Sequence, residues 1–221
     1  MTDTRKTPQG IFIHFGNIIS GNFKIGQEVK LKIDSSLREL IKKNHSATHL
    51  LHAALRNNLG LHVAQRGSLV NENKLRFDFS HNKQISSKQI DTIQKEVTNI
   101  ISNTCETQID IKSQEEAIKL GAMALFGEKY GEEVRVLSMG DEKENYFSTE
   151  LCGGTHVRNT GDIGKFKIIS QSSIAAGVRR VEALRDKQLD DYLKNKEKLS
   201  DLSAQKDEQT IKEISEKIIK A

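Results

Sequence analysis

NHSATHLLHAAL, residues 44–55, carries three histidines in an otherwise apolar run that favours a helix. His45 and His49 are four residues apart, and His52 follows three residues later. Residues four apart lie on one face of a helix with their Cβ atoms about 6 Å apart, so two imidazoles at this spacing reach one metal ion. Such a pair alone is more often structural than metal-binding. The stretch therefore predicts a metal site only if further ligands occur elsewhere in the chain.

A second group of candidate ligands lies in LCGGTHV, residues 151–157. Cys152 and His156 are again four residues apart, but Gly153 and Gly154 between them predict a loop, whose backbone can bend so that thiolate and imidazole converge. By itself this motif is equally typical of a glycine-rich turn. A thiolate with three imidazoles suits zinc, and two pairs on separate elements predict one joint site. The predicted zinc ligands are His45, His49, Cys152 and His156.

The residues around the helical pair argue against peptidase chemistry. A zinc-peptidase helix carries His-Glu-x-x-His, whose glutamate is the general base, whereas Ser46 follows His45 here. His52 lies near the same helix face, where it either supports the ligands or, more typically, packs at the helix edge. The remaining histidines are expected at the surface or at strand edges, as lone histidines usually are. They are His14, His62 and His81.

Helical and strand patterns follow one another along the chain without strict alternation. A long helix is expected from about Ser36 to Leu59, with Gly60 as its C-cap, and the turn-like NEN favours a hairpin over 67–80. This mixture predicts an α+β fold, in which a mixed or antiparallel sheet packs with helices that carry the zinc site. The other expected elements are helices near 87–103 and 115–127 and strands at 107–112, 133–139, 145–151, 161–172 and 179–184.

The two ends of the chain differ from the middle. Residues 11–15 (IFIHF) and 28–34 (EVKLKID) alternate apolar and polar side chains and predict two strands. Two strands are too few to stand alone, so residues 1–35 are expected to end a partial β-barrel domain. Residues 185–221 lack Gly, Pro and Cys and carry a thin apolar stripe. They predict a C-terminal helix, either solvated or a connector to a further domain. Residues 36–184 are the expected zinc-containing domain.

Composition narrows the classes of protein to consider. The chain has 221 residues, enough for a real core, and its 29% of charged residues make it polar. No apolar run approaches the roughly 18 residues of a membrane span, and the first residues lack the apolar core of a signal peptide. A cytoplasmic protein without a membrane partner is therefore expected. Two cysteines are too few for a disulfide scaffold, and the net charge of +4 permits a nucleic-acid partner without requiring one.

Two long motifs carry a family resemblance: NHSATHLLHAALRNNLGLHVAQRGSLVNENKLRFDFSH (44–81) and CGGTHVRNTGDIGKFKIISQSSIAAGVRRVEAL (152–184). They closely resemble the editing domain of bacterial alanyl-tRNA synthetases, and the resemblance runs from about residue 9 to 185. It implies an aminoacyl-tRNA deacylase that uses zinc to hydrolyse serine, and also glycine, from the acceptor end of tRNA(Ala). The ATP-binding aminoacylation domain of that family is not in this sequence, so the chain is not expected to charge tRNA. The other domains of such a synthetase are implied partners.

An editing site for serine needs a small polar pocket beside the ester. An apolar pocket rejects an added hydroxyl by only about a hundredfold, whereas a site that hydrogen-bonds the hydroxyl discriminates by about 10⁴ or more. By resemblance, Gln65 matches a pocket residue with a catalytic and substrate-binding role; without the resemblance it is an ordinary loop glutamine. The hydroxyls of Thr48 and Thr155 are further catalytic candidates, and that of Ser68 a substrate-binding one. Thr48 equally fits a helix residue that bonds its own backbone.

Phosphate contacts to the tRNA would come from lysine and arginine. Arg76 is the substrate-binding candidate, although an ion-paired or solvated role is more typical of any single cation near the motifs, including Arg66, Lys165, Arg179 and Arg180.

Two alternatives to the deacylase remain: a zinc-stabilised tRNA-binding module without catalysis, and editing of threonyl-tRNA, which the CGGTH spacing disfavours. Four protein ligands leave the role of zinc open between an organiser of the pocket and a Lewis acid.

Overall fold

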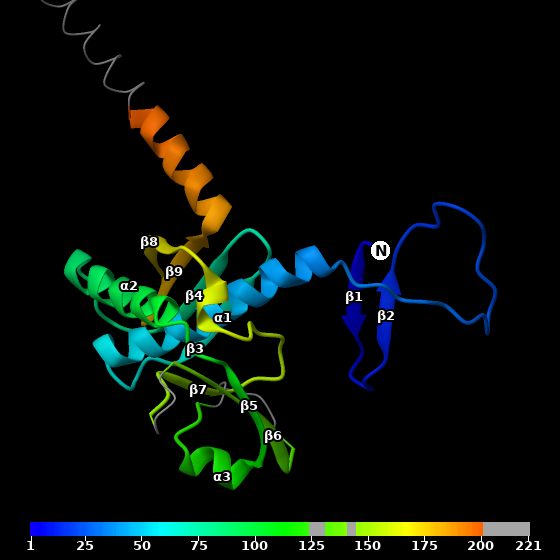
Figure 1. The fold of residues 1–221 in the computed structure, drawn as a ribbon, viewed down its shortest axis with the longest axis horizontal. Coiled ribbons are helices and arrows are strands. Elements are labelled where there is room, and N and C mark those ends of the chain that lie inside the picture. The colour runs from blue at the N-terminus through cyan, green and yellow to red at the C-terminus, as the bar shows by residue number, and fades with distance from the viewer. Residues whose placement is uncertain (124–130, 141–144, 201–221) are drawn as a thin grey trace, which may run out of the picture. The chain divides into compact units, whose positions relative to one another are not determined.

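The computed structural model describes residues 1–123, 131–140 and 145–200. The chain divides into two units, Met1–Ile33 and a larger one that begins at Asp34 (Figure 1). Among the described residues, no helix combines the length and the apolar character that crossing a membrane requires.

The first unit contains a two-stranded antiparallel ribbon with exposed side chains. β1 (Asp3–Lys6) pairs with β2 (Phe12–Phe15), so the strand predicted at 11–15 is confirmed. The strand predicted at 28–34 is wrong, because these residues form no regular structure. Alternating side chains do not make a strand unless the backbone N–H and C=O groups find partners, and β2 finds them in β1. The ribbon shows no barrel, so the partial barrel stays a prediction.

α1 (Ser35–Leu59) confirms the predicted long helix. Asp34 caps its first turn, where the carboxylate accepts a hydrogen bond from the Leu37 amide at 2.9 Å. The helix ends at Gly60, whose φ of +114° is a conformation that favours glycine. Nearly every side chain between residues 44 and 55 is buried, so the stretch with the histidines lies in the core of the larger unit.

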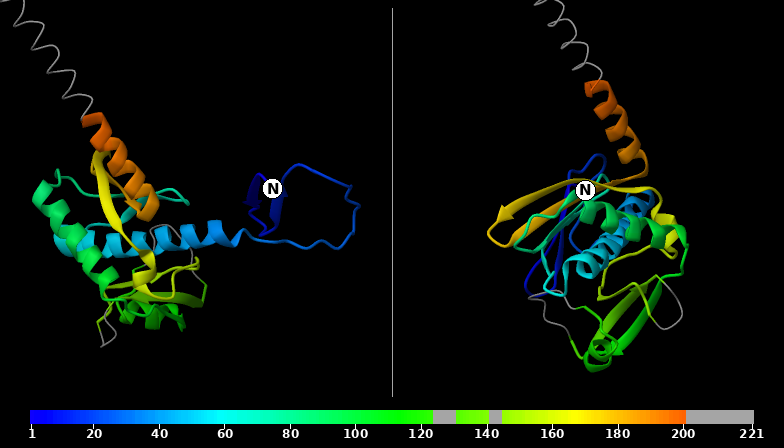
Figure 2. Two further views of the ribbon diagram at one scale, coloured as in Figure 1. Left: turned by 45° about the horizontal axis from the view of Figure 1, so that its top comes forward. Right: turned by 90° about the vertical axis from the view of Figure 1, so that its left-hand side faces the viewer.

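A four-stranded antiparallel sheet, in the order β3-β4-β9-β8, covers α1. The strands are β3 (Gln65–Val70), β4 (Leu75–Ser80), β8 (Phe166–Ala175) and β9 (Val178–Arg185). α1 and α2 (Ser87–Ser102) lie side by side against one face of this sheet (Figure 2), and their apolar residues share a core with Phe77 and Phe79. The predicted hairpin, second helix and last strand are confirmed.

The strand predicted at 161–172 begins later than expected. Thr160–Ile163 forms a short 3-10 helix, η1, and Gly164 with φ of +78° then turns the chain into β8. The 3-10 turn is held by Asn159, whose side-chain oxygen accepts a hydrogen bond from the Gly161 amide at 2.8 Å. The polar and glycine residues at the start of the segment therefore favour a capped turn over an extended strand.

The second sheet has three antiparallel strands in the order β5-β6-β7. They are β5 (Gln108–Ser113), β6 (Glu133–Met139) and β7 (Ser148–Leu151). α3 (Gln114–Lys119) is shorter than the predicted helix 115–127, because Gly121 with φ of +75° ends it and Met123 pairs with Glu150. Residues 124–127 of that prediction lie outside the described residues. β7 likewise starts at Ser148, three residues later than predicted.

Residues 186–200 form a helix after β9, as predicted for the start of the C-terminal region. Its first turns are attached to the larger unit by the buried Leu189 and by an ion pair of 2.9 Å between Lys165 and Asp190. The rest of the predicted C-terminal helix, residues 201–221, lies outside the described residues. The described part of the chain is thus an α+β fold with antiparallel sheets, in agreement with the predicted class.

Candidate metal centre and its cavity

Two elements bring the four predicted ligands together. α1 carries His45 and His49 one turn apart, while Cys152 and His156 lie in the loop after β7. One ligand atom from each residue lies within 4.8 Å of the others. The three imidazole rings are 4.3 to 5.0 Å apart between their centroids. Residues more than a hundred positions apart in the sequence thus converge at one point.

The distances and the donor types fit a tetrahedral zinc ion. Cys152 Sγ lies 3.3 Å from His156 Nε2 and 3.6 Å from His45 Nε2. At zinc–ligand lengths of about 2.0–2.3 Å, two tetrahedral ligands are about 3.6 Å apart. His49 Nε2 is buried without a hydrogen-bond partner, which is costly unless something else contacts it. One sulfur and three nitrogens, of which His49 Nε2 has no hydrogen-bond partner, fit the kind of ion that the sequence predicted.

The CGGTH loop is held in place by groups on two neighbouring elements. Arg135 on β6 donates hydrogen bonds to the carbonyl oxygens of Cys152 and Gly154, both at 2.7 Å. Ser46 Oγ on α1 accepts a hydrogen bond from the Val157 amide at 3.1 Å and lies 3.4 Å from His156 Nδ1. Ser46, at the position that carries glutamate in a zinc peptidase, therefore orients a predicted ligand.

Glu150 is a buried carboxylate that the sequence analysis missed. It accepts from His49 Nδ1 at 2.7 Å and from His52 Nδ1 at 3.2 Å, and Ser148 Oγ lies 3.3 Å from it. A carboxylate on the Nδ1 side of a histidine leaves Nε2 for the metal and fixes the ring. No clear signal for this role was present in the sequence, because strand alternation in NYFSTEL (145–151) groups Glu150 with Ser148 on the face opposite Phe147 and Leu151.

Electrostatics at the centre favour anionic groups. Burial raises the pKa of the Glu150 carboxyl, but the charge of His49 and hydrogen bonds from His49 and His52 outweigh it and hold this pKa well below its usual range. Burial also opposes ionisation of the Cys152 thiol, yet hydrogen bonds from His156 and His45 lower its pKa to about 3. Cys152 is therefore a thiolate, the form that binds zinc.

The two buried histidines of the centre differ in charge. Burial lowers the pKa of His156 to about 4, so its ring is neutral. Burial also lowers the pKa of His49, but the charge of Glu150 outweighs it and raises this pKa to about 10. Without a metal, His49 is thus an imidazolium paired with Glu150, and an entering metal must displace the proton on Nε2.

A small cavity of about 130 Å³ lies beside the centre. Three of the predicted pocket residues line it, namely Thr48, Gln65 and Ser68. Thr48 also donates a hydrogen bond to the Asn44 carbonyl at 2.8 Å, so the backbone-bonding interpretation of this hydroxyl holds as well. The other lining residues are His45, His49, His52, Phe77, Glu150 and Cys152.

The structure does not bring the remaining candidates to this cavity. Thr155 is exposed in the CGGTH loop, and Arg76 lies on β4 one residue from the inward-facing Phe77, with its Nε 3.6 Å from Asp78. Among the other cations, Arg180 forms a two-pronged ion pair with Asp78, Lys165 pairs with Asp190, and Arg179 donates a hydrogen bond to the Lys83 carbonyl. The ion-paired interpretation applies to Arg180 and Lys165.

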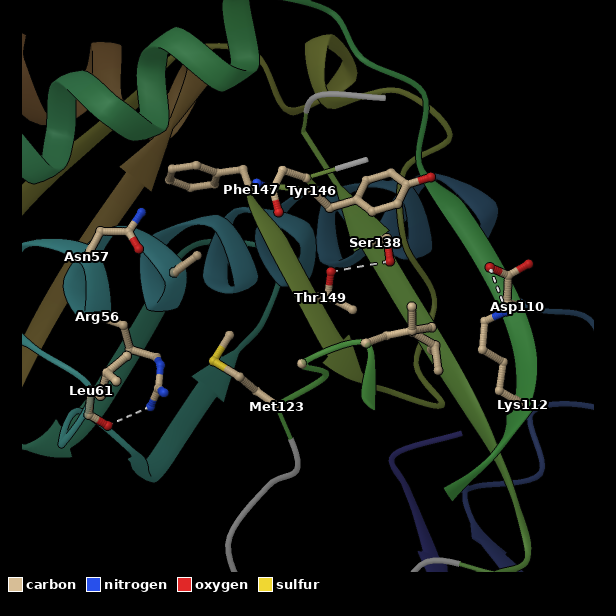
Figure 3. A pocket seen from close by; sticks show the side chains of 15 residues that line it. Arg56, Asn57, Leu61, Asp110, Lys112, Met123, Ser138, Tyr146, Phe147 and Thr149 are labelled. Carbon is tan, nitrogen blue, oxygen red and sulfur yellow. Dashed lines mark hydrogen bonds and ion pairs between the residues drawn. The ribbon is translucent and has the colours of Figure 1, made fainter. Parts of the chain in front are cut away.

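A second and larger cavity, of about 600 Å³, lies on the other side of β7 (Figure 3). Thr149 lines it next to Ser138, with 3.5 Å between the two hydroxyl oxygens, and the rings of Tyr146 and Phe147 lie near them. Thr149 and Glu150 are neighbours on one strand and point to opposite faces, as strand geometry requires. The two cavities share no lining residue.

Comparisons with known proteins agree with the motifs. Residues 134–182 match the family described as the threonyl and alanyl tRNA synthetase second additional domain. The chain is 50% identical over 189 residues to an alanine–tRNA ligase of Mesorhizobium japonicum, which covers 83% of this chain and 21% of the relative. An alanine–tRNA ligase of Parvibaculum lavamentivorans is 51% identical over 185 residues, which covers 82% of this chain and 21% of the relative.

These matches confirm the resemblance that the motifs carry. The chain is homologous to alanine–tRNA ligases over most of its length. It spans about a fifth of the length of the curated relatives that it matches.

Proposed function

We propose that this relative of the alanine–tRNA ligases is an editing domain that hydrolyses the ester of Ser-tRNA(Ala), and of Gly-tRNA(Ala), at a zinc-dependent site. The observation that carries the proposal is the position of the predicted ligands. His45, His49 and Cys152 belong both to the cluster and to the wall of the small cavity. A group held by the cluster therefore meets whatever enters the cavity.

The size and the lining of the cavity suit an amino-acid side chain. Its volume of about 130 Å³ is far below the 300–1,000 Å³ or so typical of pockets that take whole drug-sized ligands. The hydroxyl of Thr48 and the amide of Gln65 provide polar groups in its wall. A polar wall favours serine over alanine. The apolar amino-acid pocket of an aminoacylation site has the opposite preference.

The residues around the cluster would orient the ester for attack by water. A zinc ion held there would supply Lewis acidity for the ester carbonyl. Glu150 holds His49, Ser46 holds His156, and Arg135 holds the CGGTH loop, so the ligands are positioned before the substrate arrives. Preorganised groups of this kind lower the barrier without reorganisation during the reaction.

The test measures release of the amino acid from three preparations of the same tRNA(Ala), charged with serine, glycine or alanine. We expect the zinc-loaded chain to release serine and glycine and to spare alanine. Cys152→Ala should lose both zinc and activity, whereas Cys105→Ala, which changes the cysteine outside the cluster, should keep both. Full serine release by a Cys152→Ala protein without zinc contradicts the proposal.

A tRNA-binding module without catalysis is the second candidate. The observation in its favour is that the cluster offers four protein side chains. They would occupy all four coordination positions of a tetrahedral ion, as in structural zinc sites. This function predicts that the chain binds tRNA(Ala), with an affinity that falls steeply with salt, and that it releases none of the three amino acids. Release of serine in the same assay decides between the two functions.

A further inference from the structure

His52 lines the small cavity, and the proposed function has not yet given it a role. It is only 5% exposed, and its ring lies 5.0 Å from the ring of Phe77, between centroids. Its Nδ1 lies 3.2 Å from Glu150, but its Nε2 is buried without any hydrogen-bond partner. A buried nitrogen left unpaired costs about 1–3 kcal/mol, so it marks a place where a partner is expected.

The contact with Glu150 determines what this free nitrogen offers. The carboxylate of Glu150 only accepts hydrogen bonds, so Nδ1 of His52 carries the donated proton. In a neutral ring with its proton on Nδ1, Nε2 is an acceptor. The cavity therefore has a hydrogen-bond acceptor in its wall, held in one orientation by the same carboxylate that holds His49.

The position of His52 along α1 separates it from the predicted metal ligands. It follows His49 by three residues, which is about 4.5 Å further along the helix axis. If the ester carbonyl lies at the cluster of His45 and His49, a substrate side chain that extends along the helix reaches His52, which lines the same cavity. In that arrangement His52 lies at the side-chain end of the substrate, and the metal ligands lie at the ester.

We propose that His52 is a specificity-determining residue, whose Nε2 accepts a hydrogen bond from the hydroxyl of a seryl ester. The inference rests on the proposed function and extends it to the way in which serine is distinguished from alanine. Serine satisfies the buried nitrogen. Alanine places a methyl group there, which fills the space and leaves the nitrogen without a partner.

The same arrangement accounts for the release of glycine and the sparing of alanine that the proposed function requires. The cavity of about 130 Å³ has room for about four water molecules at roughly 30 Å³ each. Glycine has no side chain, so a water can remain next to Nε2 and pair with it. Only the methyl group of alanine both displaces this water and offers no hydrogen bond in its place.

Two substitutions separate the cavity-facing nitrogen from the contact with Glu150. In His52→Asn, the side-chain amide occupies the place of Nδ1 and can keep the contact with Glu150, but nothing replaces Nε2. In His52→Gln, the amide reaches the place of Nε2. We expect His52→Asn to lower the ratio of serine to alanine release by about 10- to 100-fold, and His52→Gln to retain most of it. His62→Asn is the matched control, since His62 is exposed and lies outside the cavity lining.

Binding provides a readout that does not depend on hydrolysis. Adenosine carrying serine or alanine through a stable 3′-amide is titrated into wild-type and variant protein, with zinc content measured alongside. We expect wild-type protein to prefer the seryl compound, and His52→Asn to lose this preference while keeping zinc. An unchanged preference in His52→Asn, or an equal loss for every amino acid together with loss of zinc, overturns the inference. A wild-type protein that prefers the seryl compound but releases no serine contradicts only the proposed function.

Discussion

At the scale of single residues, the two glycines of the CGGTH loop have different roles. A Cβ on Gly154 would lie 2.4 Å from Cε1 of His45, whereas a Cβ on Gly153 would meet nothing within 4 Å. Neither glycine has a positive φ. The requirement at Gly154 is therefore space for a ligand ring, and Gly153 is free of that constraint.

This difference predicts unequal effects of two matched substitutions. Gly154→Ala displaces His45 by more than the roughly 0.5 Å that a metal site tolerates, so we expect zinc affinity to fall on the order of tenfold or more. Gly153→Ala should bind zinc as the wild type does. Competition with a chromophoric chelator measures both affinities. Equal affinities in the two variants would show that the loop does not approach His45 as described.

The buried carboxylate provides a second prediction at this scale. Glu150→Gln keeps the size of the side chain but removes the charge that holds Nδ1 of His49. We expect about 10- to 100-fold weaker zinc binding, as for other carboxylates that support a metal-binding histidine. Glu115→Gln, at a side chain that is 80% exposed, is the control and should leave the affinity unchanged. Wild-type zinc affinity in Glu150→Gln is the result that contradicts this role.

The sequence singles out the four side chains that cluster, but not the residues that support them. His45, His49, Cys152 and His156 have residue types and spacings that point to a metal before any fold is known. Ser46, Arg135 and Glu150 act through contacts with segments that are distant along the chain, and their residue types are common everywhere. Such partners become visible only when the tertiary structure places them.

At the scale of elements, Arg185 links the end of β9 to two other segments. It is 2% exposed and donates hydrogen bonds to the side chain of Asn44 at 2.7 Å and to the carbonyls of Leu40 and Ile163. Burial lowers the pKa of its guanidinium. Asn44 directly precedes His45 on α1. Arg185 therefore connects the four-stranded sheet to the part of α1 that carries the candidate metal centre.

Loss of this link should destabilise the fold. Arg185→Ala leaves several buried acceptors unpaired, and we expect the free energy of unfolding to fall by about 3 kcal/mol. Lys187→Ala, at an exposed position two residues later, should change it by less than about 0.5 kcal/mol. Denaturant unfolding of both variants provides the measurement. A loss below about 1 kcal/mol in Arg185→Ala would contradict the assigned contacts.

Most helices and strands could be predicted from the periodicity of apolar residues and from capping residues. The segments that were predicted incorrectly share one cause. The long helix ends where Gly60 predicts, and β6 spans the predicted 133–139. The misplaced strand at 28–34 and the overlong helix from 115 depended on side-chain pattern alone. Pairing partners and a glycine with positive φ decided these segments, and neither is evident from the alternation of apolar residues.

At the scale of the whole molecule, the site belongs to one of the two units. Every residue of the cluster and of the small cavity lies after Asp34. We therefore expect removal of residues 1–33 to leave zinc affinity and the unfolding midpoint of the larger unit unchanged. Comparison of the shortened and full chains by chelator competition and denaturant unfolding tests this independence. Loss of zinc binding on shortening contradicts it.

The central claim is that one thiolate and three imidazoles hold a single zinc ion next to the small cavity. X-ray absorption at the zinc edge of the purified, zinc-loaded chain tests it most directly. The account predicts one sulfur at about 2.3 Å and three nitrogens at about 2.0–2.1 Å, with the sulfur lost in Cys152→Ala. A zinc environment of nitrogen and oxygen alone in the wild-type chain, without sulfur, would contradict the account.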